Sequence, residues 1–305
     1  MRSFVALVAF SYALASHPIT AITTAEEEVT MSRLRRYKGG GRRLIGDLVD
    51  TTPWREGYTP GEVNAVQDQE ERTHGVWPLS AGTVVLHRPG IVGSTYSFDG
   101  GMKTFKRRNV DFESGVKMTK QNAVFVVQAG GVLRNVIIAG GGGVFCETHN
   151  CALVNVWFKD SVQAALHINS GTGITTVTGG GAKNVAGRVI FGQASGTVVV
   201  SGGFHMEHSG MLFESCSTCG PVKRGIVVDG VVSVNPTAEL IRVNSNYNDR
   251  GTIASATITT TDADYPVCTR YNGGVVPQKL GAGAFPPICS FSRSNVKIKP
   301  VEQAV

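Results

Sequence analysis

The sequence of 305 residues contains, after Ala15, no apolar run long enough to cross a bilayer. It also lacks the 3.6-residue apolar periodicity that is typical of amphipathic helices, and no linker separates its strand-like segments. These absences argue against transmembrane helices and against a helical bundle. They favour one large domain rather than two smaller ones.

What is present is a recurring apolar stretch that ends at a small or polar turn. It occurs between Leu133 and Val232 as LRNVII at Asn135, LVNVWF at Asn155, TVTGGG at Thr178, VVSGGF at Gly202 and VVDGVV at Gly230, at intervals of 20, 23, 24 and 28 residues. Repeats of this length, rich in Val and Ile, indicate rungs that bury their apolar side chains on neighbouring rungs. We therefore predict an all-β fold, a single-stranded parallel β-helix, in which equivalent positions of successive rungs form one surface.

The N-terminal residues have the pattern of a secretory signal peptide over residues 1–15. Arg2 is followed by an apolar run from Phe4 to Ala13 and by an A-x-A cleavage pattern at Ala13 and Ala15. We predict that the protein is secreted. Residues 16–80 are predicted to form a largely disordered arm, and residues 81–305 the β-helix, with a C-terminal stretch after Pro277 that wraps over the solenoid.

Six cysteines in an exported chain are expected to form disulfides, although their number leaves the connectivity open. We predict local pairs: Cys146 with Cys151, Cys216 with Cys219 and Cys268 with Cys289. A zinc site at the C-x-x-C of Cys216 and Cys219 is the alternative, but Cys146 and Cys151 have looser spacing than zinc sites usually show.

The net charge of +6 and the pI near 9.1 suit a polyanionic partner. Outside a cell, an acidic polysaccharide is a more natural polyanion than nucleic acid. We therefore expect no nucleic-acid partner, no membrane partner and a monomeric protein.

Two polar clusters are interpreted as structural. His205 and His208 flank Glu207, but side chains at odd separation on a strand face opposite sides, so both histidines cannot face one ion. In NSNYND, the alternating Asn244, Asn246 and Asn248 are predicted to form stacked amide hydrogen bonds inside a rung.

Several short motifs of the sequence occur together in one known family. FDGGMKTF from Phe98, VFVVQAGGVLRNVIIAG, CALVNVWFKD, TGGGAKN, SGT, ESCSTC and NSNYND resemble the pectate lyases of polysaccharide lyase family 3 from plant-associated microbes, over roughly Phe98 to Cys268. The resemblance implies a right-handed parallel β-helix that is secreted. It also implies calcium-dependent β-elimination of polygalacturonate, the acidic component of plant cell wall pectin.

The reaction that the resemblance implies has definite chemical needs. A proton must leave C5 beside a uronate carboxylate, so a cation must neutralise that carboxylate and a base must accept the proton. Calcium prefers several oxygen ligands, usually from clustered Asp and Glu.

At most positions that supply these groups in the family, this sequence carries another residue. The acids of the family correspond to Gly142, Gln163, Ala164 and Gly187, and two of its basic residues correspond to Met211 and Glu214. Arg188 alone keeps a positive charge. We therefore assign no metal ligand, regard calcium as the cofactor implied by the family only, and predict a weak or lost active site. Arg188 is the candidate catalytic residue, and Arg188, Lys223 and Arg224 are the candidates for substrate binding.

Two readings of the function remain open from the sequence. The first is a pectate lyase of low activity, and the second is a noncatalytic polygalacturonate-binding protein or host-directed effector. RRLI at Arg42 and DQEER at Asp68 are similar to the Arg-x-Leu-Arg and Glu-Glu-Arg words of secreted oomycete effectors. Dibasic pairs at Arg35 and Arg42 equally fit a cleavable pro-region.

Overall fold

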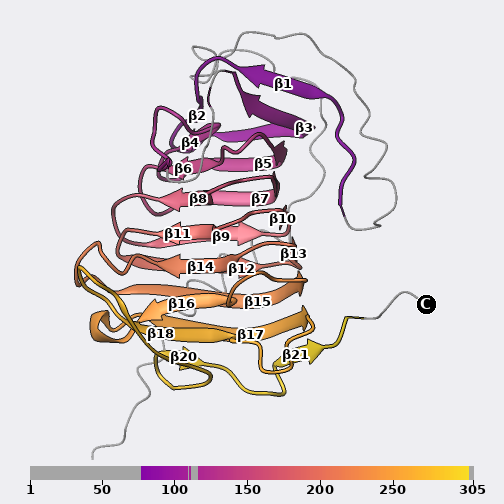
Figure 1. Cartoon of the computed structure of the whole chain (residues 1–305). Coiled ribbons are helices and arrows are strands. Elements are labelled where there is room, and N and C mark those ends of the chain that lie inside the picture. The colour runs from indigo at the N-terminus through magenta and orange to yellow at the C-terminus, as the bar shows by residue number, and fades with distance from the viewer. Residues whose placement is uncertain (1–76, 109, 111–115, 302–305) are drawn as a thin grey trace, which may run out of the picture. The chain divides into compact units, whose positions relative to one another are not determined.

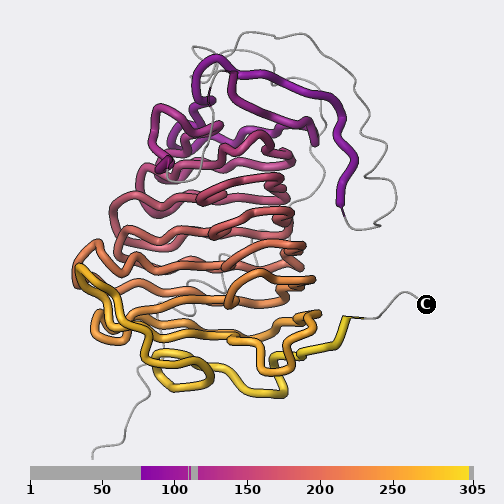
Figure 2. Tube along the Cα trace, viewed as in Figure 1, coloured from indigo at the N-terminus to yellow at the C-terminus, as the bar shows by residue number. Residues whose placement is uncertain are grey.

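The computed structural model describes residues 77–108, 110 and 116–301. The predicted signal peptide, most of the predicted arm and the RRLI and DQEER words lie outside these residues. Within the described part, strands stack rung upon rung along the chain (Figures 1 and 2), and no α-helix occurs. The structure thus confirms the predicted all-β fold, a right-handed parallel β-helix.

Two sheets run along the stack of described rungs. The 12-stranded sheet, here sheet A, contains β1 (Thr83–Leu86), β3 (Ser97–Arg107), β5 (Val132–Ile138), β7 (Ala152–Lys159), β9 (Ile174–Thr178), β10 (Gly181–Lys183), β12 (Gly196–Ser201), β13 (His205–Glu207), β15 (Arg224–Val234), β17 (Arg250–Thr259), β20 (Cys289–Ser290) and β21 (Val296–Lys299). The 9-stranded sheet, here sheet B, contains β2 (Gly90–Val92), β4 (Phe125–Val127), β6 (Val144–Cys146), β8 (Ala164–Ile168), β11 (Arg188–Gly192), β14 (Met211–Ser215), β16 (Ile241–Asn244), β18 (Cys268–Asn272) and β19 (Gln278–Ala282). A short 3-10 helix, η3 (Ser245–Tyr247), follows β16.

The core is built from columns of aliphatic side chains, one from each rung. One column in sheet A consists of Leu133, Leu153, Val177, Val200, Val228 and Ile253, which are paired in register and at most 1% exposed. Burying such a side chain fully contributes about 1.5–3 kcal/mol. The spacing of this column reproduces the predicted recurrence, which confirms that the repeat marks successive rungs.

A left-handed residue lies within or directly after each of the recurring apolar stretches. Asn135 and Asn155 have φ 54°, and Gly179, Gly202 and Gly230 have φ of 63°, 77° and 80°. Only glycine and, to a lesser degree, asparagine adopt this backbone at low cost. The turn predicted at Thr178 therefore lies one residue later, at Gly179.

A second row of left-handed turns contains polar side chains that pair between rungs. Asp160, Asn184, His208 and Asn235 all have positive φ. The Asn184 amide donates to Asp160 at 3.0 Å, and Asn235 Nδ2 lies 3.3 Å from His208 Nε2. His208 is therefore a turn residue of the β-helix, in agreement with its structural interpretation.

The two ends of the described β-helix add two details to the sequence analysis. Trp77, near the end of the arm predicted to be largely disordered, is buried and packs edge-on against Trp157 with ring centroids 5.0 Å apart. After Pro277, β19 folds back antiparallel to β18, but β20 and β21 continue sheet A in parallel with β17. The alternation of Val296 and Ile298 with lysines gives β21 its strand pattern.

Three disulfides join the cysteine pairs that were predicted: Cys146–Cys151, Cys216–Cys219 and Cys268–Cys289, with Cα–Cα distances of 6.3, 5.5 and 5.9 Å. This pairing leaves no free cysteine in the described chain for a zinc site. No helix among the described residues is long and apolar enough to span a membrane.

Candidate substrate cleft

A cleft of about 470 Å³ lies on the side of sheet B. Strands β6, β8 and β11, the segment 117–121 and the loop after β14 supply its walls. Its lining residues are Lys117, Met118, Thr119, Lys120, Gln121, Phe145, Gln163, Ala164, His167, Asn169, Arg188, Phe191, Gln193, Cys216, Thr218 and Cys219. Three of the sequence-predicted site residues, Gln163, Ala164 and Arg188, therefore meet in one cleft.

Arg188 occupies the middle of a column of three predicted site residues. Its backbone is paired with Ala164 on one neighbouring strand and with Met211 on the other. Met211 is only 7% exposed and lies outside the cleft lining. Met211 is therefore aligned with Arg188 and not with Gly187, the residue before β11.

The two glycines of the predicted set lie beside this column. Gly142 follows the isolated bridge between Gly141 and Ser161. A Cβ atom on Gly187 would lie 2.6 Å from the carbonyl oxygen of Gln163, which is closer than such atoms approach in proteins. Residue 187 therefore has no room for any side chain in this backbone.

The Arg188 guanidinium is held by two neighbours. Its Nη1 donates to Glu214 Oε2 at 2.6 Å, and its Cζ lies 4.3 Å from the centre of the Phe191 ring. The Arg188 Nε is buried without a hydrogen-bond partner. The candidate catalytic residue is therefore engaged in a partly exposed ion pair, with side-chain exposures of 26% for Arg188 and 13% for Glu214.

Glu214 also connects the cleft to a second arginine that the sequence analysis did not identify. Its Oε1 lies 3.7 Å from Arg242 Nη1, and Arg242 Nε donates to Glu239 at 2.7 Å. The Arg242 guanidinium stacks over Tyr271 at 4.6 Å from the ring centre. Burial lowers the pKa of Arg242, but Glu239 and Glu214 together raise it above its ordinary value.

Aromatic rings form a continuous column along the cleft floor. Phe145, His167 and Phe191 are paired in register on β6, β8 and β11, with ring centroids 5.1 and 5.2 Å apart. Burial lowers the pKa of His167 to about 4, although a hydrogen bond with Gln193 opposes this effect. His167 is consequently neutral near pH 7 and contributes a flat, uncharged surface beside Arg188.

Lysines add positive charge at the cleft rim. Lys117 and Lys120 come from the segment that precedes β4, and Lys120 forms an ion pair with Glu147. No periodicity marked this segment in the sequence, so its place over the cleft could be found only in the structure.

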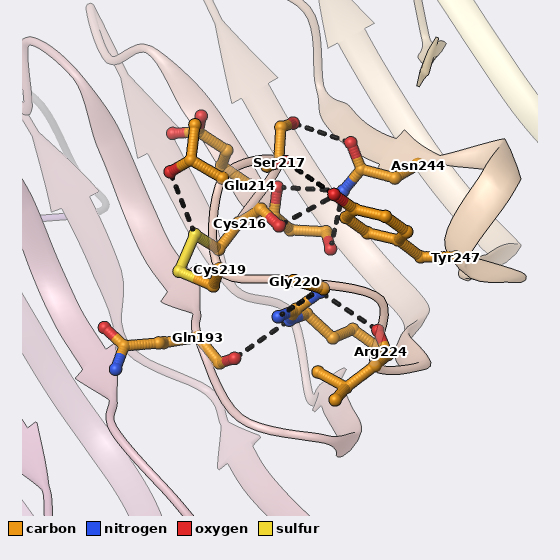
Figure 3. Close-up of a disulfide and its surroundings, with 12 residues drawn as sticks. Gln193, Glu214, Cys216, Ser217, Cys219, Gly220, Arg224, Asn244 and Tyr247 are labelled. Carbon is orange, nitrogen blue, oxygen red and sulfur yellow. Dashed lines mark hydrogen bonds between the residues drawn. A yellow bond between two sulfur atoms is a disulfide. The ribbon is translucent and has the colours of Figure 1, made fainter. Parts of the chain in front are cut away.

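Arg224 does not fit the predicted role in substrate binding, because it is 1% exposed. Its guanidinium donates to the backbone carbonyls of Gln193, Val222 and Gly220 at 2.9, 3.0 and 3.4 Å (Figure 3). It thereby joins the end of β11 to the loop that carries the Cys216–Cys219 disulfide. We correct its role to a structural one, whereas the neighbouring Lys223 is exposed.

The NSNYND segment is structural, as predicted, but its bonds differ from a stack of amides. Buried Asn244 accepts a hydrogen bond from Ser217 at 2.6 Å, and its amide donates to Asp249 at 3.0 Å. Asp249 also accepts from Ser215 and from the backbone N–H of Arg224, at 2.6 and 2.8 Å. This buried network joins the disulfide loop to the end of β16 and to the start of β15 (Figure 3).

The cleft does not fit a calcium ion. Calcium prefers several carboxylate and carbonyl oxygens, and the described residues contain no group of three or more His, Cys, Asp or Glu side chains suited to a metal. Glu214, the carboxylate that contacts Arg188, is already shared between two arginines.

A parallel β-helix with an open cleft of arginine, lysine and aromatic side chains defines a class of protein suited to an extended acidic chain. Comparison with known proteins specifies the class. The sequence model of the pectate lyase family matches residues 74–276, and the chain belongs to this family.

Curated relatives and solved structures agree with the family. Probable pectate lyase E of Aspergillus clavatus is 36% identical over 233 residues, which is 74% of this chain and 88% of the relative. Probable pectate lyase D of Emericella nidulans is 38% identical over 68% of this chain and 79% of the relative. The catalytic domain of pectate lyase PelI from Erwinia chrysanthemi has a TM-score of 0.57 at 27% identity, over 69% of this chain and 98% of that domain. PelI in complex with tetragalacturonic acid has a TM-score of 0.57 at 25% identity, over 68% of this chain and 70% of that chain.

Proposed function

We propose that this member of the pectate lyase family is a secreted protein that binds polygalacturonate in the cleft at Arg188, and that its β-elimination activity is weak or lost. The ligand is the acidic component of plant cell wall pectin. The supporting observation is the cleft itself, in which Arg188 and Lys117 lie beside the aromatic column. An acidic sugar chain offers carboxylates for the cations and flat sugar faces for the rings.

The chemistry of the cleft supports the weak or lost reaction. β-Elimination next to a uronate carboxylate needs that carboxylate to be neutralised and a base to remove the C5 proton. At the two cleft-lining positions where the family resemblance implies acids, this chain carries Gln163 and Ala164, which supply no carboxylate. A guanidinium is a poor base for removing a carbon-bound proton, and the Arg188 guanidinium is already engaged by the Glu214 carboxylate.

Two measurements on the secreted protein test the proposal. Absorbance of the unsaturated uronate product is followed with polygalacturonate and calcium, and again with a chelator. Binding is measured in parallel with polygalacturonate and, as a matched control, with neutral galactan. We expect saturable binding of the acidic chain with little product. Calcium-dependent product at the rate of an active pectate lyase would refute the loss of activity, and equal binding of galactan would refute recognition of the carboxylates.

A further inference from the structure

Glu214 lies where it can compete with the substrate. We propose that its carboxylate is an internal ligand of Arg188 and Arg242, and that it sets how tightly the cleft binds uronate carboxylates. This inference rests on the proposed function, because it specifies the affinity of the same cleft. It adds Glu214, with its second partner Arg242, as a residue that controls the affinity of the cleft.

The geometry shows one carboxylate divided between two arginines. Glu214 Oε2 accepts from Arg188 at 2.6 Å, and Oε1 lies 3.7 Å from Arg242. Phe191, Glu214 and Arg242 are paired in register on β11, β14 and β16. The ladder of sheet B therefore fixes these positions, and no flexible loop is needed to bring them together.

A uronate carboxylate would use the same chemistry. Arginine binds carboxylates through charge-assisted hydrogen bonds, so an external carboxylate must displace or share the Glu214 oxygens. The internal ligand has the advantage of being held in place by the fold. A uronate carboxylate therefore competes for Arg188 with the Glu214 carboxylate, which is covalently part of the chain and always present beside it.

The charges around the pair lead to the same conclusion. Arg188 and Arg242 are balanced by Glu214 and Glu239, which contact them directly. This group of four side chains has no net charge and exerts little net attraction on a polyanion. Removing the Glu214 charge would leave one uncompensated arginine at the cleft.

The opposite role makes the opposite prediction. If Glu214 instead held Arg188 in the orientation that substrate needs, its neutralisation would weaken binding. The direction of the change in affinity therefore decides between an internal ligand and a positioning residue.

The test compares Glu214→Gln with Glu239→Gln, which removes the same charge from the same group but contacts Arg242 at 2.7 Å rather than Arg188. Affinity for polygalacturonate is measured by calorimetry without calcium. We expect Glu214→Gln to bind roughly fivefold more tightly and Glu239→Gln to change affinity less than about twofold. Unchanged or weaker binding by Glu214→Gln, or an equal gain in both variants, would overturn the proposal.

A second measurement separates this inference from the proposed function. If neither wild type nor Glu214→Gln binds polygalacturonate, the proposed function fails. The internal ligand is then judged by a double-mutant cycle of Arg188→Met and Glu214→Gln in urea unfolding. A measurable coupling between the two substitutions supports the internal ion pair, and additive effects overturn it.

Discussion

Asn155 donates a hydrogen bond from its side-chain amide to the side-chain oxygen of Asn135, 3.0 Å away on the neighbouring rung. Both residues are in the left-handed conformation, so the same positions that turn the chain also tie one rung to the next. Asn135 in turn donates to Asp99 at 2.9 Å, and the Trp157 indole donates to Asn155 at 2.7 Å. The turn row is thus a hydrogen-bonded ladder across three rungs.

The ladder leads to a prediction that separates backbone from side chain. Asn155→Gly keeps the left-handed turn but loses the amide, and it should lower the free energy of unfolding by about 1–2 kcal/mol. Asn155→Ala loses the amide and strains the turn, so it should lower it by about 2–4 kcal/mol. Urea unfolding of both variants measures the difference. Equal stabilities would mean that the turn conformation contributes nothing.

Arg224 and Lys223 form a matched pair of adjacent cations, one buried and one exposed. Arg224→Met should lower the free energy of unfolding by about 3 kcal/mol, because carbonyl groups in the interior lose their donors. Arg224→Lys should recover little of this loss, since an ammonium lacks the planar fork that reaches several carbonyls. Lys223→Met should change the free energy by less than about 0.5 kcal/mol. Thermal unfolding of the three variants checks the order.

Arg188 is expected to matter for binding more than for folding. Arg188→Met should weaken polygalacturonate binding by roughly fivefold, because an exposed cation–carboxylate contact contributes at most about 1 kcal/mol. Lys297→Met removes an exposed charge from β21, outside the cleft lining, and is the control. Calorimetric titration measures both variants. The same loss in Lys297→Met would show that net charge, rather than the cleft, governs binding.

Two buried histidines predict a loss of stability in acid. Burial lowers the pKa of His149 and of His167 to about 4, below the ordinary value of 6.5. The unfolded chain therefore binds protons more readily, and stability falls as pH drops from 6.5 towards 4 and then levels off. Each histidine contributes up to about 3 kcal/mol to this loss.

Urea unfolding at pH 7 and pH 4.5 measures the effect. His149→Gln and His167→Gln should each reduce the difference between the two pH values, and the double variant should reduce it further. A double variant with the wild-type pH dependence would show that other groups cause the acid sensitivity.

The rungs of sheet A were predictable because their chemistry repeats. An aliphatic residue such as Leu133 or Leu153 must point inward in every rung, and an asparagine or glycine must follow where φ becomes positive. Both requirements therefore produce a sequence pattern that recurs once per rung. The error at Thr178 is small because Gly179 and Gly180 both satisfy the turn.

The details of the cleft were less predictable, because several strands of sheet B are short and do not alternate buried with exposed side chains. Strand β8 is buried at all five positions, so no pattern shows which face its side chains take. Lys223 and Arg224 are neighbours of the same charge, and only the register of β15 shows which one points inward. The ion pair between Arg188 and Glu214 joins two rungs, and its identity depends on register rather than on composition.

The close approach at Gly187 limits how this chain could change over evolutionary time. Even a methyl group at position 187 would collide with the Gln163 carbonyl oxygen. A substitution to aspartate therefore cannot be accommodated without a shift of the backbone. Two adjacent coils would have to separate, against the backbone bonds that hold them together. An aspartate at position 187, which the family resemblance implies, would therefore require a shift of the main chain as well as a new side chain.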